Sequence, residues 1–579
     1  MHRTHYADQI DAQITGQSVK IAGWVHRRRD HGGIIFLDIR DRTGLVQVVV
    51  EPSTKDLFEQ ADHLRPEYVV ALAGLVQKRP PGMVNPELRS GEVEILPNSL
   101  EILAEAKVPP FSVSDGETVD ELLRMKYRYI DLRRQPLFKN FELRDRVIWS
   151  IREYFHQHHF IDVETPQLAR STPEGARDFL VPSRVQPGSF YALPQSPQIF
   201  KQLLMVAGFD RYYQIAKVFR DEDLRADRQP EFTQVDVEMA FVDQEDVLRS
   251  MEAMVVQVFH EAMGITLAPF PRLTWDQALE RYGSDKPDLC AGEPLVNVSP
   301  IAQSKKLPVL GSSEMVAGVV LRRLSPSRKV LDELVAEAKE LGAGGLVWMV
   351  RGQDGLRTNL KALGESGLEL LAKATALAQG DALLLVAGDK ARTLAVAGQL
   401  RLAAARKFGQ MESGWRFLWV TDFPLFEWSE DEQRITSAHH PFTMPKIDDW
   451  QQLAEDPLSL RSQAYDLVLN GVELASGSVR IHRPDWQRQV FMVLGLEPSE
   501  IEQKFGFMLD AFQYGAPPHA GIAFGIDRLI MLMAGAKSLR EVIAFPKTAR
   551  GIDPLMDAPS QVDAKQLRDL GLRLDGPSL

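Results

Sequence analysis

The sequence predicts an α+β multidomain protein with an N-terminal five-stranded β-barrel, a larger α+β domain on an antiparallel sheet, and an inserted α+β domain. Three observations predict this division. Short apolar runs between Gly, Pro, Asp or Asn breaks fill roughly the first hundred residues, as in a small barrel. Two later stretches alternate helical windows with strand-like segments. A segment rich in Ala, Leu and Gly separates these two stretches.

The barrel strands come first along the chain. We expect them at residues 21–25, 33–39, 45–50, 69–76 and 92–96. A proline-containing connector at 106–110 follows, and 127–134 is charged enough to favour a hinge over a core element. The expected boundaries are 1–106 for the barrel, 107–139 for the hinge, 140–290 and 415–557 for the two parts of the larger domain, 291–414 for the insert, and 558–579 for a C-terminal extension.

Composition excludes several classes of protein. Lys and Arg total 67 and Asp and Glu total 79 in 579 residues, so the net charge of −12 excludes a polycation that holds nucleic acid by bulk charge. No apolar run approaches the roughly 18 residues of a membrane-spanning helix, so we expect no membrane association. The N-terminal residues lack the apolar core of a secretory signal, and the single cysteine, Cys290, cannot form an internal disulfide. These features favour a cytoplasmic location.

Missing motifs narrow the chemistry further. The chain has no Gly-Lys dipeptide, which excludes a P-loop. With one cysteine, and with His439 and His440 adjacent so that an extended segment would point them to opposite faces, no compact zinc constellation is visible. A hard cation bound by carboxylates remains open.

The first positive signal is a pair of strand-like segments at 211–220 and 232–241. In the second segment one face carries Val235, Val237, Met239 and Phe241, and the other carries Phe232, Gln234, Asp236 and Glu238. This alternation predicts a half-buried strand with a polar working face, paired antiparallel with the first segment. The charged connection, 221–231, is too long for a tight turn and favours a flap that grips a ligand. A solvated edge hairpin with surface charges is the alternative reading.

At this point the chain resembles a known family. Residues 219–222, read as Phe-Arg-Asp-Glu, together with 160–166 and 521–528, resemble the three signatures of class II aminoacyl-tRNA synthetases, in the same order. The finer segments 171–179, 195–202 and 439–443 are similar to bacterial aspartyl-tRNA synthetases, and the similarity covers essentially the whole chain. The insert lies where that bacterial family carries an extra domain, of a type also found in a subunit of the tRNA-dependent amidotransferase.

The resemblance implies an aspartate–tRNA ligase. It would activate L-aspartate with ATP to aspartyl-adenylate, release pyrophosphate, and transfer aspartate to the 3′ end of tRNA(Asp). The fold implied is an OB-type anticodon-binding barrel joined to a class II synthetase catalytic domain on its antiparallel sheet. The implied chain is a homodimer that uses Mg²⁺ with ATP.

The resemblance also implies the residues of the site. Arg220 and Arg528 would be catalytic, because a guanidinium fork suits phosphate and carboxylate oxygens. The ATP-binding residues implied are Arg220, Glu222, Gln229, Phe232, Glu473, Gly525 and Arg528, with adenine stacked between Phe232 and Arg528. The aspartate-binding residues implied are Glu174, Ser196, Gln198, Lys201, Arg220, Asp236, His439 and Arg480, and the metal ligands are Asp466 and Glu473. Taken singly, Arg528 could be a structural ion pair and each of the others an ordinary surface or cap residue.

The barrel carries the implied tRNA contacts. Alternation along 33–40 places Phe36 on the wet face, where an exposed ring suits base stacking, unless it only covers a neighbouring loop. By the family pattern, Arg29, His31, Phe36, Gln47 and Glu94 contact the anticodon. His31 stands where many relatives have leucine, and with Gly82 it resembles forms that also aspartylate tRNA(Asn) and pass the product to an amidotransferase. An inert loop position for His31 is the alternative.

Two other functions remain open at this point. One is a sister synthetase for asparagine or lysine, which the segment 198–201 and the insert disfavour. The other is a non-catalytic tRNA-binding paralogue. Such a paralogue usually loses Arg220, Arg528 or the metal carboxylates, and this chain keeps them.

Overall fold

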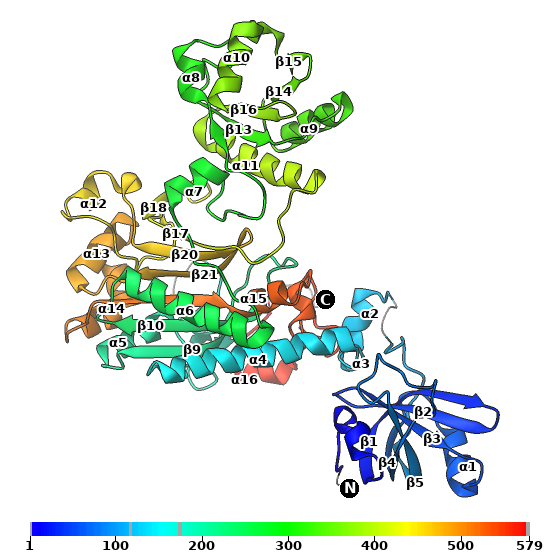
Figure 1. Ribbon diagram of the computed structural model, residues 1–579. Coiled ribbons are helices and arrows are strands. Elements are labelled where there is room, and N and C mark those ends of the chain that lie inside the picture. Colours follow the sequence, from blue (N-terminus) through cyan, green and yellow to red (C-terminus); the bar gives the residue numbers. More distant parts are fainter. Residues whose placement is uncertain (1–2, 115–117, 172–175, 575–579) are drawn as a thin grey trace. The chain divides into compact units, whose positions relative to one another are not determined.

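The protein is described here from a computed structural model, which covers residues 3–114, 118–171 and 176–574. The chain forms two compact units: residues 1–139 with 553–558, and residues 140–552 with 559–579 (Figure 1). Within the described residues, no helix has both the length and the apolar character needed to cross a membrane.

The first unit contains a closed five-stranded barrel in the order β1-β2-β3-β5-β4, which confirms the predicted barrel (Figure 1, blue). The strands are β1 Ser18–His31, β2 Ile34–Arg40, β3 Leu45–Val50, β4 Val69–Lys78 and β5 Val93–Ala104; the helices are η1 Ala7–Gln9, η2 Ala12–Ile14, α1 Lys55–His63, α2 Glu121–Lys126 and α3 Arg128–Asp131. Alternate residues such as Val19, Ile21, Ile35 and Leu37 fill the interior. Strands β1 and β5 are longer than expected, so the basic residues 27–29 lie within β1.

The segment 127–134 differs from the sequence-based expectation. A hinge rather than a core element was expected, but the segment contains the short helix α3 and buries charge: Asp131 is 0% exposed and Arg128 is 3% exposed. Arg128 donates to Asp131 at 2.7 Å and Arg124 does so at 2.9 Å. Because the buried carboxylate has these partners, the charge density of this segment does not keep it out of a packed environment.

The second unit is organised on an eight-stranded sheet in the order β11-β17-β20-β21-β22-β10-β9-β6. Its strands are β6 Ile161–Asp162, β9 Arg211–Phe219, β10 Glu231–Ala240, β11 Arg272–Thr274, β17 Phe417–Thr421, β20 Ala464–Leu469, β21 Val472–Val479 and β22 His519–Gly525. Only the two edge pairs, β6–β9 and β11–β17, are parallel. The predicted antiparallel hairpin is confirmed, with Asp236 paired to Gln214.

Helices cover one face of this sheet. Outside the insert, the second unit contains the helices α4 Gln135–Gln157, which begins in the first unit, α5 Gln198–Val206, α6 Gln244–Met263, α7 Trp275–Tyr282, α12 Gln452–Glu455, η4 Pro457–Ser459, α13 Pro484–Val493, α14 Pro498–Phe512, α15 Ile526–Met533, η5 Leu539–Glu541 and α16 Ala564–Asp569. It also contains two small hairpins, β7 Leu180–Pro182 with β8 Phe190–Ala192 and β18 Phe426–Ser429 with β19 Arg434–Ser437. Helices α4 and α6 lie side by side and pack on Val235, Val237 and Met239 of β10 (Figure 1). The polar face of β10 is therefore turned to the opposite side, where the candidate site lies.

The insert is an α+β structure, as predicted. Its sheet has the order β12-β13-β16-β14-β15. The strands are β12 Val296–Asn297, β13 Met315–Leu321, β14 Val347–Gly352, β15 Gly355–Thr358 and β16 Ala382–Gly388; the helices are α8 Ser299–Ser304, α9 Arg328–Glu340, η3 Lys361–Leu363, α10 Gly364–Ala374 and α11 Lys390–Lys407. Leu383 and Leu385 enter one core, whereas Leu384 and Val386 enter another. Helices thus cover both faces, and β16 reads as a continuous apolar run.

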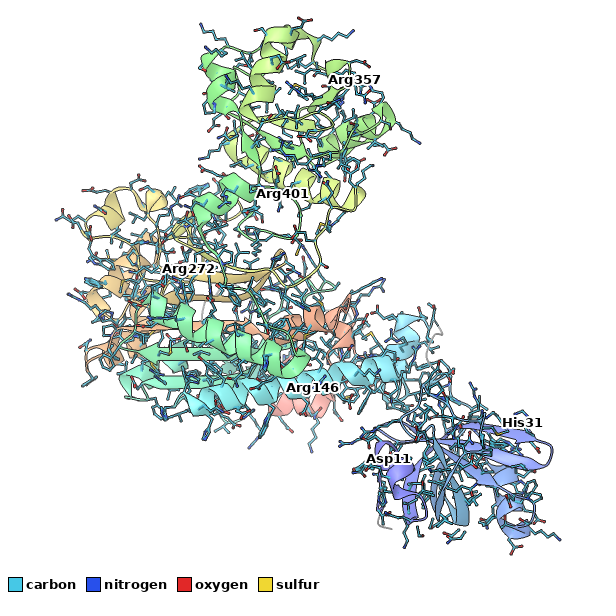
Figure 2. All side chains as sticks on the ribbon, viewed as in Figure 1. Asp11, His31, Arg146, Arg272, Arg357 and Arg401 are labelled. Atoms are coloured by element: carbon cyan, nitrogen blue, oxygen red, sulfur yellow. The ribbon has the colours of Figure 1, made fainter. Side chains whose placement is uncertain are left out.

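The first and last residues of the insert lie side by side. Ala291 and Met411 form a β-bridge, and the amide of Glu412 donates to the carbonyl of Cys290 at 2.8 Å. The side chain of Arg401 in α11, labelled in Figure 2, donates to the backbone carbonyls of Asp288 and Glu293. The two connecting segments are therefore hydrogen-bonded to each other where they join the part of the unit that holds the eight-stranded sheet.

Candidate active site

A cavity of about 690 Å³ opens on the polar side of β10, β20, β21 and β22. It is lined by nearly all the residues that the resemblance implied for ATP, aspartate and metal: Ser196, Gln198, Lys201, Arg220, Glu222, Gln229, Phe232, Asp236, His439, Asp466, Glu473, Arg480, Gly525 and Arg528. Glu174 lies outside the described residues. Leu224, Asp227 and Arg228 of the predicted flap also border the cavity.

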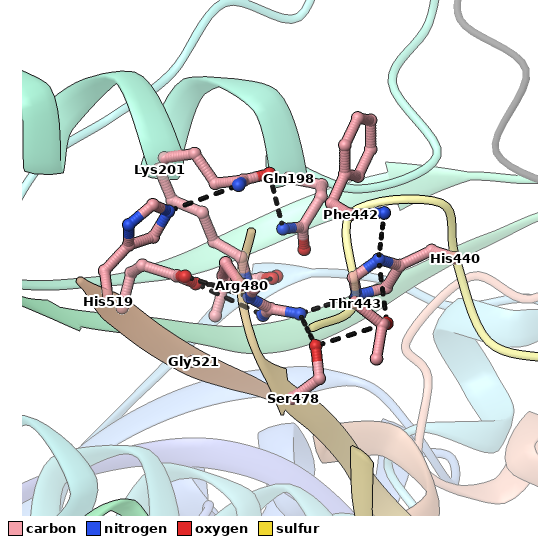
Figure 3. A network of polar contacts seen from close by, with 12 residues as sticks. Gln198, Lys201, His440, Phe442, Thr443, Ser478, Arg480, His519 and Gly521 are labelled. Atoms are coloured by element: carbon pink, nitrogen blue, oxygen red, sulfur yellow. Dashed lines mark hydrogen bonds and ion pairs between the residues drawn. The ribbon is translucent and has the colours of Figure 1, made fainter. Parts of the chain in front are cut away.

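One end of the cavity is a buried network of opposite charges (Figure 3). Arg480 donates to Glu238 through Nε at 2.9 Å and through Nη2 at 3.2 Å. The Lys201 ammonium lies 3.1 Å from Oδ1 of Asp236 and 3.4 Å from Oε2 of Glu238. All four residues are at most 1% exposed, so each ion depends on the others for its stabilisation.

Glu238 is the centre of this network and was not among the predicted site residues. Burial alone opposes its ionisation, but the attraction of Arg480 and Lys201 outweighs burial and lowers the pKa of Glu238. Asp236 shows the reverse balance, because burial outweighs the attraction of Lys201 and raises its pKa. The backbone makes room for Glu238 at Gly521 of β22, where a Cβ atom would stand 1.9 Å from Oε2 of Glu238. The glycine at this position of the 521–528 motif is therefore a steric requirement.

Two residues that line the cavity each have a buried polar side-chain atom without a hydrogen-bond partner among the described residues. Within the described part of the chain, Oδ2 of Asp236 and Nε of Arg220 have no hydrogen-bond partner. An unsatisfied buried polar atom costs free energy in the empty site. An acceptor and a donor that both face a ligand-sized cavity are suited to an ammonium and to an anion, respectively.

His440 supports Arg480 from the side opposite Glu238. Nε2 of His440 and Oγ of Ser478 both contact Nη1 of Arg480. Burial lowers the pKa of His440 well below its usual range, so its ring is neutral, and the backbone amide of Phe442 donates to its Nδ1 at 3.2 Å. Burial also lowers the pKa of His439, to about 4. Both histidines line the cavity, contrary to the opposite faces expected of an extended segment, because the chain bends there instead of forming a strand.

Two carboxylates on neighbouring strands also line the cavity. Asp466 lies on β20 and Glu473 lies on β21, across the turn at 470–471. Burial raises the pKa of Asp466 well above its usual range, and the charge of Glu473 raises it further. Oδ1 of Asp466 has no hydrogen-bond partner among the described residues, although Nε2 of His439 lies 3.6 Å away. Such a pair of carboxylates is suited to a hard divalent cation.

A cation from the chain already stands beside this pair. Lys286 extends from the loop that leads into the insert and lies 2.8 Å from Glu473. Burial opposes the charged form of Lys286, but attraction to Glu473 outweighs it and raises the pKa of the ammonium. Lys286 was not predicted, because no local pattern in the sequence links residue 286 to residue 473.

The arginines assigned to ATP lie along the middle of the cavity. Arg528, in the first turn of α15, donates to the carbonyl of Glu473 at 2.8 Å. Its nearest carboxylate, on Asp227, is 3.8 Å away and half exposed, so the alternative of a structural ion pair is weak. The guanidinium that lies over the Phe232 ring, at 5.2 Å, belongs to Arg220. Gln229 uses both ends of its amide on the backbone of Lys547, so it positions that segment.

The barrel of the first unit brings its predicted residues to the strands β1, β2, β3 and β5. His31, at the tip of β1, is exposed and its ring packs edge-on against Phe36 at 6.0 Å (Figure 2). Gln47 donates to Glu94 at 3.0 Å, and Arg29 donates to Asp38 at 2.7 Å. Gly82 lies in an exposed turn with a φ of 89°. Phe36 is only half-buried, so part of its ring is open to a ligand.

Comparison with known proteins decides the family. The model of tRNA synthetases class II (D, K and N) matches residues 120–549. The chain belongs to this family. The model of the OB-fold nucleic acid binding domain, of the anticodon-binding type, matches residues 19–103. This synthetase is 50% identical to the aspartate–tRNA(Asp/Asn) ligase of Moorella thermoacetica, over 99% of this chain and 97% of that protein.

Further relatives agree with this assignment. An aspartate–tRNA(Asp/Asn) ligase of Syntrophomonas wolfei is also 50% identical to this synthetase, over 99% of this chain and the whole of that protein. Among solved structures, asparaginyl-tRNA synthetase from Pyrococcus horikoshii, complexed with asparaginyl-adenylate, matches 95% of this chain and 99% of that one, with a TM-score of 0.60 and 20% identity. A putative aspartyl-tRNA synthetase from Leishmania major matches with a TM-score of 0.59 and 19% identity, over 94% of each chain. These structural matches establish the shared fold.

Proposed function

We propose that this chain is an ATP-dependent aspartate–tRNA ligase that charges tRNA(Asp) and also tRNA(Asn). The names of relatives 50% identical over nearly the full length support this proposal. The observation that carries it is a single cavity lined both by two buried cations, Lys201 and Arg480, and by two carboxylates, Asp466 and Glu473.

Aspartate is proposed to bind at the cationic end. Its side-chain carboxylate would face Lys201 and Arg480, with His439 beside them. Its ammonium would take up the unused acceptor of Asp236, with Gln198 and Ser196, and with Glu174. Asparagine has the same shape but no charge, so it would leave the two buried cations without a new partner. Lysine would bring a third cation to the same place.

ATP is proposed to bind along the middle of the cavity. Arg220 would contact the α-phosphate and the substrate carboxylate, and Arg528 would contact the γ-phosphate and the adenine, which Phe232 stacks from the other side; Glu222, Gln229 and Gly525 line the same region. A carboxylate oxygen of aspartate attacks the α-phosphorus, an acyl–phosphate bond forms, and the bond to pyrophosphate breaks. A hydroxyl at the tRNA 3′ end then attacks the carbonyl carbon and AMP leaves. The protein contributes charge neutralisation and alignment, since the attacking carboxylate is already ionised.

We also propose that Asp466 and Glu473 hold Mg²⁺. The unused buried oxygen of Asp466 next to a second carboxylate supports this assignment. The described residues contain no group of three or more His, Cys, Asp or Glu side chains placed to hold a metal, so phosphate oxygens and water would complete the shell. When bound, Mg²⁺ would neutralise phosphate charge.

Pyrophosphate exchange tests the proposed function. We expect L-aspartate to support incorporation of labelled pyrophosphate into ATP, with a kcat/KM about a hundredfold or more above that of asparagine or lysine, because only aspartate pairs with Lys201 and Arg480. Rates are measured with each amino acid in turn at equal enzyme concentration. Exchange that prefers asparagine or lysine, or no exchange with any of the three, would contradict the proposal.

The OB-type barrel, residues 1–106, is proposed to bind the anticodon through Arg29, His31, Phe36, Gln47 and Glu94. We expect His31→Leu to lower charging of tRNA(Asn) relative to tRNA(Asp) by about tenfold, the effect of losing about one base contact. Both tRNAs are charged in parallel by the wild type and the variant. Because pyrophosphate exchange does not need tRNA, it is the internal control and stays constant. An unchanged ratio of the two tRNAs would remove His31 from tRNA selection.

The remaining assignments are also proposals. Exposed apolar side chains of the second unit support a homodimer: Trp149 of α4, Ile161 of β6, Leu180 of β7 and Phe190 of β8. A tRNA-dependent amidotransferase would use the aspartyl-tRNA(Asn) product, and a cytoplasmic location fits this role. The domain division is kept as predicted: hinge 107–139, catalytic parts 140–290 and 415–557, insert 291–414 and extension 558–579.

A further inference from the structure

A chain of buried hydrogen bonds runs from the start of β22 to the aspartate end of the cavity. It passes through His519, Gln202 and Gln198 (Figure 3). His519 and Gln202 are both 0% exposed, and neither lines the cavity. Gln198 lines the cavity at the other end of the chain.

The donor and the acceptor in each of these hydrogen bonds follow from one contact with a backbone carbonyl. Nδ1 of His519 lies 2.8 Å from the carbonyl oxygen of Pro517, which can only accept, so Nδ1 carries the hydrogen. Burial outweighs the attraction of Glu238 and lowers the pKa of His519, so the ring is neutral and Nε2 keeps a lone pair. The partner of Nε2, at 3.2 Å, is then the amide nitrogen of Gln202.

The same reasoning gives the orientation of the Gln202 and Gln198 side-chain amides. Once the nitrogen of Gln202 faces His519, its oxygen faces Gln198 and accepts from the Gln198 amide nitrogen at 3.0 Å. The amide oxygen of Gln198 is therefore turned away from Gln202, as Figure 3 shows, and no described residue donates to it. The reverse orientation would present two N–H donors to the substrate ammonium, which can only donate.

We propose that Gln202 and His519 are positioning residues that fix the amide of Gln198 with its oxygen toward the α-ammonium of aspartate. This inference rests on the proposed function. Neither residue touches the substrate, and they act only through the orientation of Gln198.

Comparison of aspartate with succinate tests the inference, because succinate has both carboxylates but no ammonium. In Gln202→Met the amide nitrogen of Gln198 loses its partner. We expect KM for aspartate to rise roughly tenfold, the effect of weakening one hydrogen bond to a charged group. The inhibition constant of succinate, measured by competition with aspartate in pyrophosphate exchange, should stay within about twofold because its contacts do not involve Gln198. His519→Phe, which keeps a ring but loses the acceptor, should give the same selective loss.

The matched control is Gln487→Met, another glutamine that is 0% exposed, whose amide donates to the carbonyl of Pro441 instead. It should leave the ratio of aspartate to succinate affinity unchanged. Equal losses for both ligands in Gln202→Met and in His519→Phe, or an equal change of the ratio in Gln487→Met, would overturn the inference. If Gln202→Met does not fold, His519→Phe decides by the same ratio. A wild-type enzyme without aspartate-dependent exchange would contradict the proposed function instead.

Discussion

Replacing Arg480 with leucine is expected to lower kcat/KM for aspartate in pyrophosphate exchange by about a hundredfold or more, which corresponds to roughly 3 kcal/mol of transition-state binding. Arg480 is 1% exposed and is held by Glu238, Ser478 and His440. Leucine removes the cation proposed to meet the substrate side chain, and it also leaves Glu238 with less compensation. Arg480→Lys keeps the positive charge but loses the bidentate contact, so we expect an intermediate loss of kcat/KM.

A neighbouring arginine provides the control for this prediction. Arg483 is exposed, lies three residues further along the chain, and pairs with Asp485 at 2.7 Å outside the cavity. Arg483→Leu should leave the kinetics close to those of the wild type. The KM for ATP should also change far less than the KM for aspartate in Arg480→Leu. If Arg480→Leu has wild-type kinetics with aspartate, Arg480 does not belong to the side-chain pocket.

The second large effect concerns stability. Glu238→Gln is expected to lower the free energy of unfolding by about 3–5 kcal/mol at pH 7, because two buried cations lose their shared counterion. Urea denaturation of the full-length variant and wild type measures this difference. Glu261→Gln, an exposed position on α6, is the control and should change the midpoint little.

The same pair of proteins has a defined pH dependence. The pKa of Glu238 is lower in the folded protein than in the unfolded chain, because its buried cationic partners outweigh the cost of burial. The stability that it contributes is therefore complete above the unfolded pKa and is lost as the pH falls through the folded pKa. The wild type should lose its advantage over Glu238→Gln under acidic conditions. A wild type and a Glu238→Gln variant that unfold at the same urea concentration at pH 7 would refute the central role of Glu238.

The sequence predicts those parts of the fold that are determined by a pattern among residues close together in the chain. Alternation along 232–241 correctly assigns an apolar face to Val235, Val237 and Met239 and a polar face to Asp236 and Glu238. It is wrong for Phe241, which lies beyond the end of β10 and is 76% exposed. The barrel is predicted for the same reason, since a period of two is visible within a single strand. The motif residues Arg220, Arg480 and Arg528 come from distant segments, and the structure places them around one cavity.

The missed residues are those whose environment depends on distant partners. In the sequence, Glu238 looks like an ordinary solvent-facing acid. In the structure it is paired with Arg480, 242 positions later, and it packs against the backbone of Gly521. Lys286 belongs to a boundary segment without any local pattern, yet its ammonium reaches Glu473. The buried Asp131 is similar, because charge in sequence suggests a solvated hinge and only the structure shows the arginines that neutralise it. Composition records that charges are present but not how they pair.

The bridge between Ala291 and Met411 has a consequence for how such a chain can change over time. The two segments that connect the insert are hydrogen-bonded to each other at this bridge. The length and sequence of the insert therefore impose little constraint on the strand order of the eight-stranded sheet. The entropy of closing a loop grows only slowly with its length, so a whole domain can be accommodated there about as readily as a short excursion. That junction is the natural place to graft, trim or swap a module without disturbing catalysis.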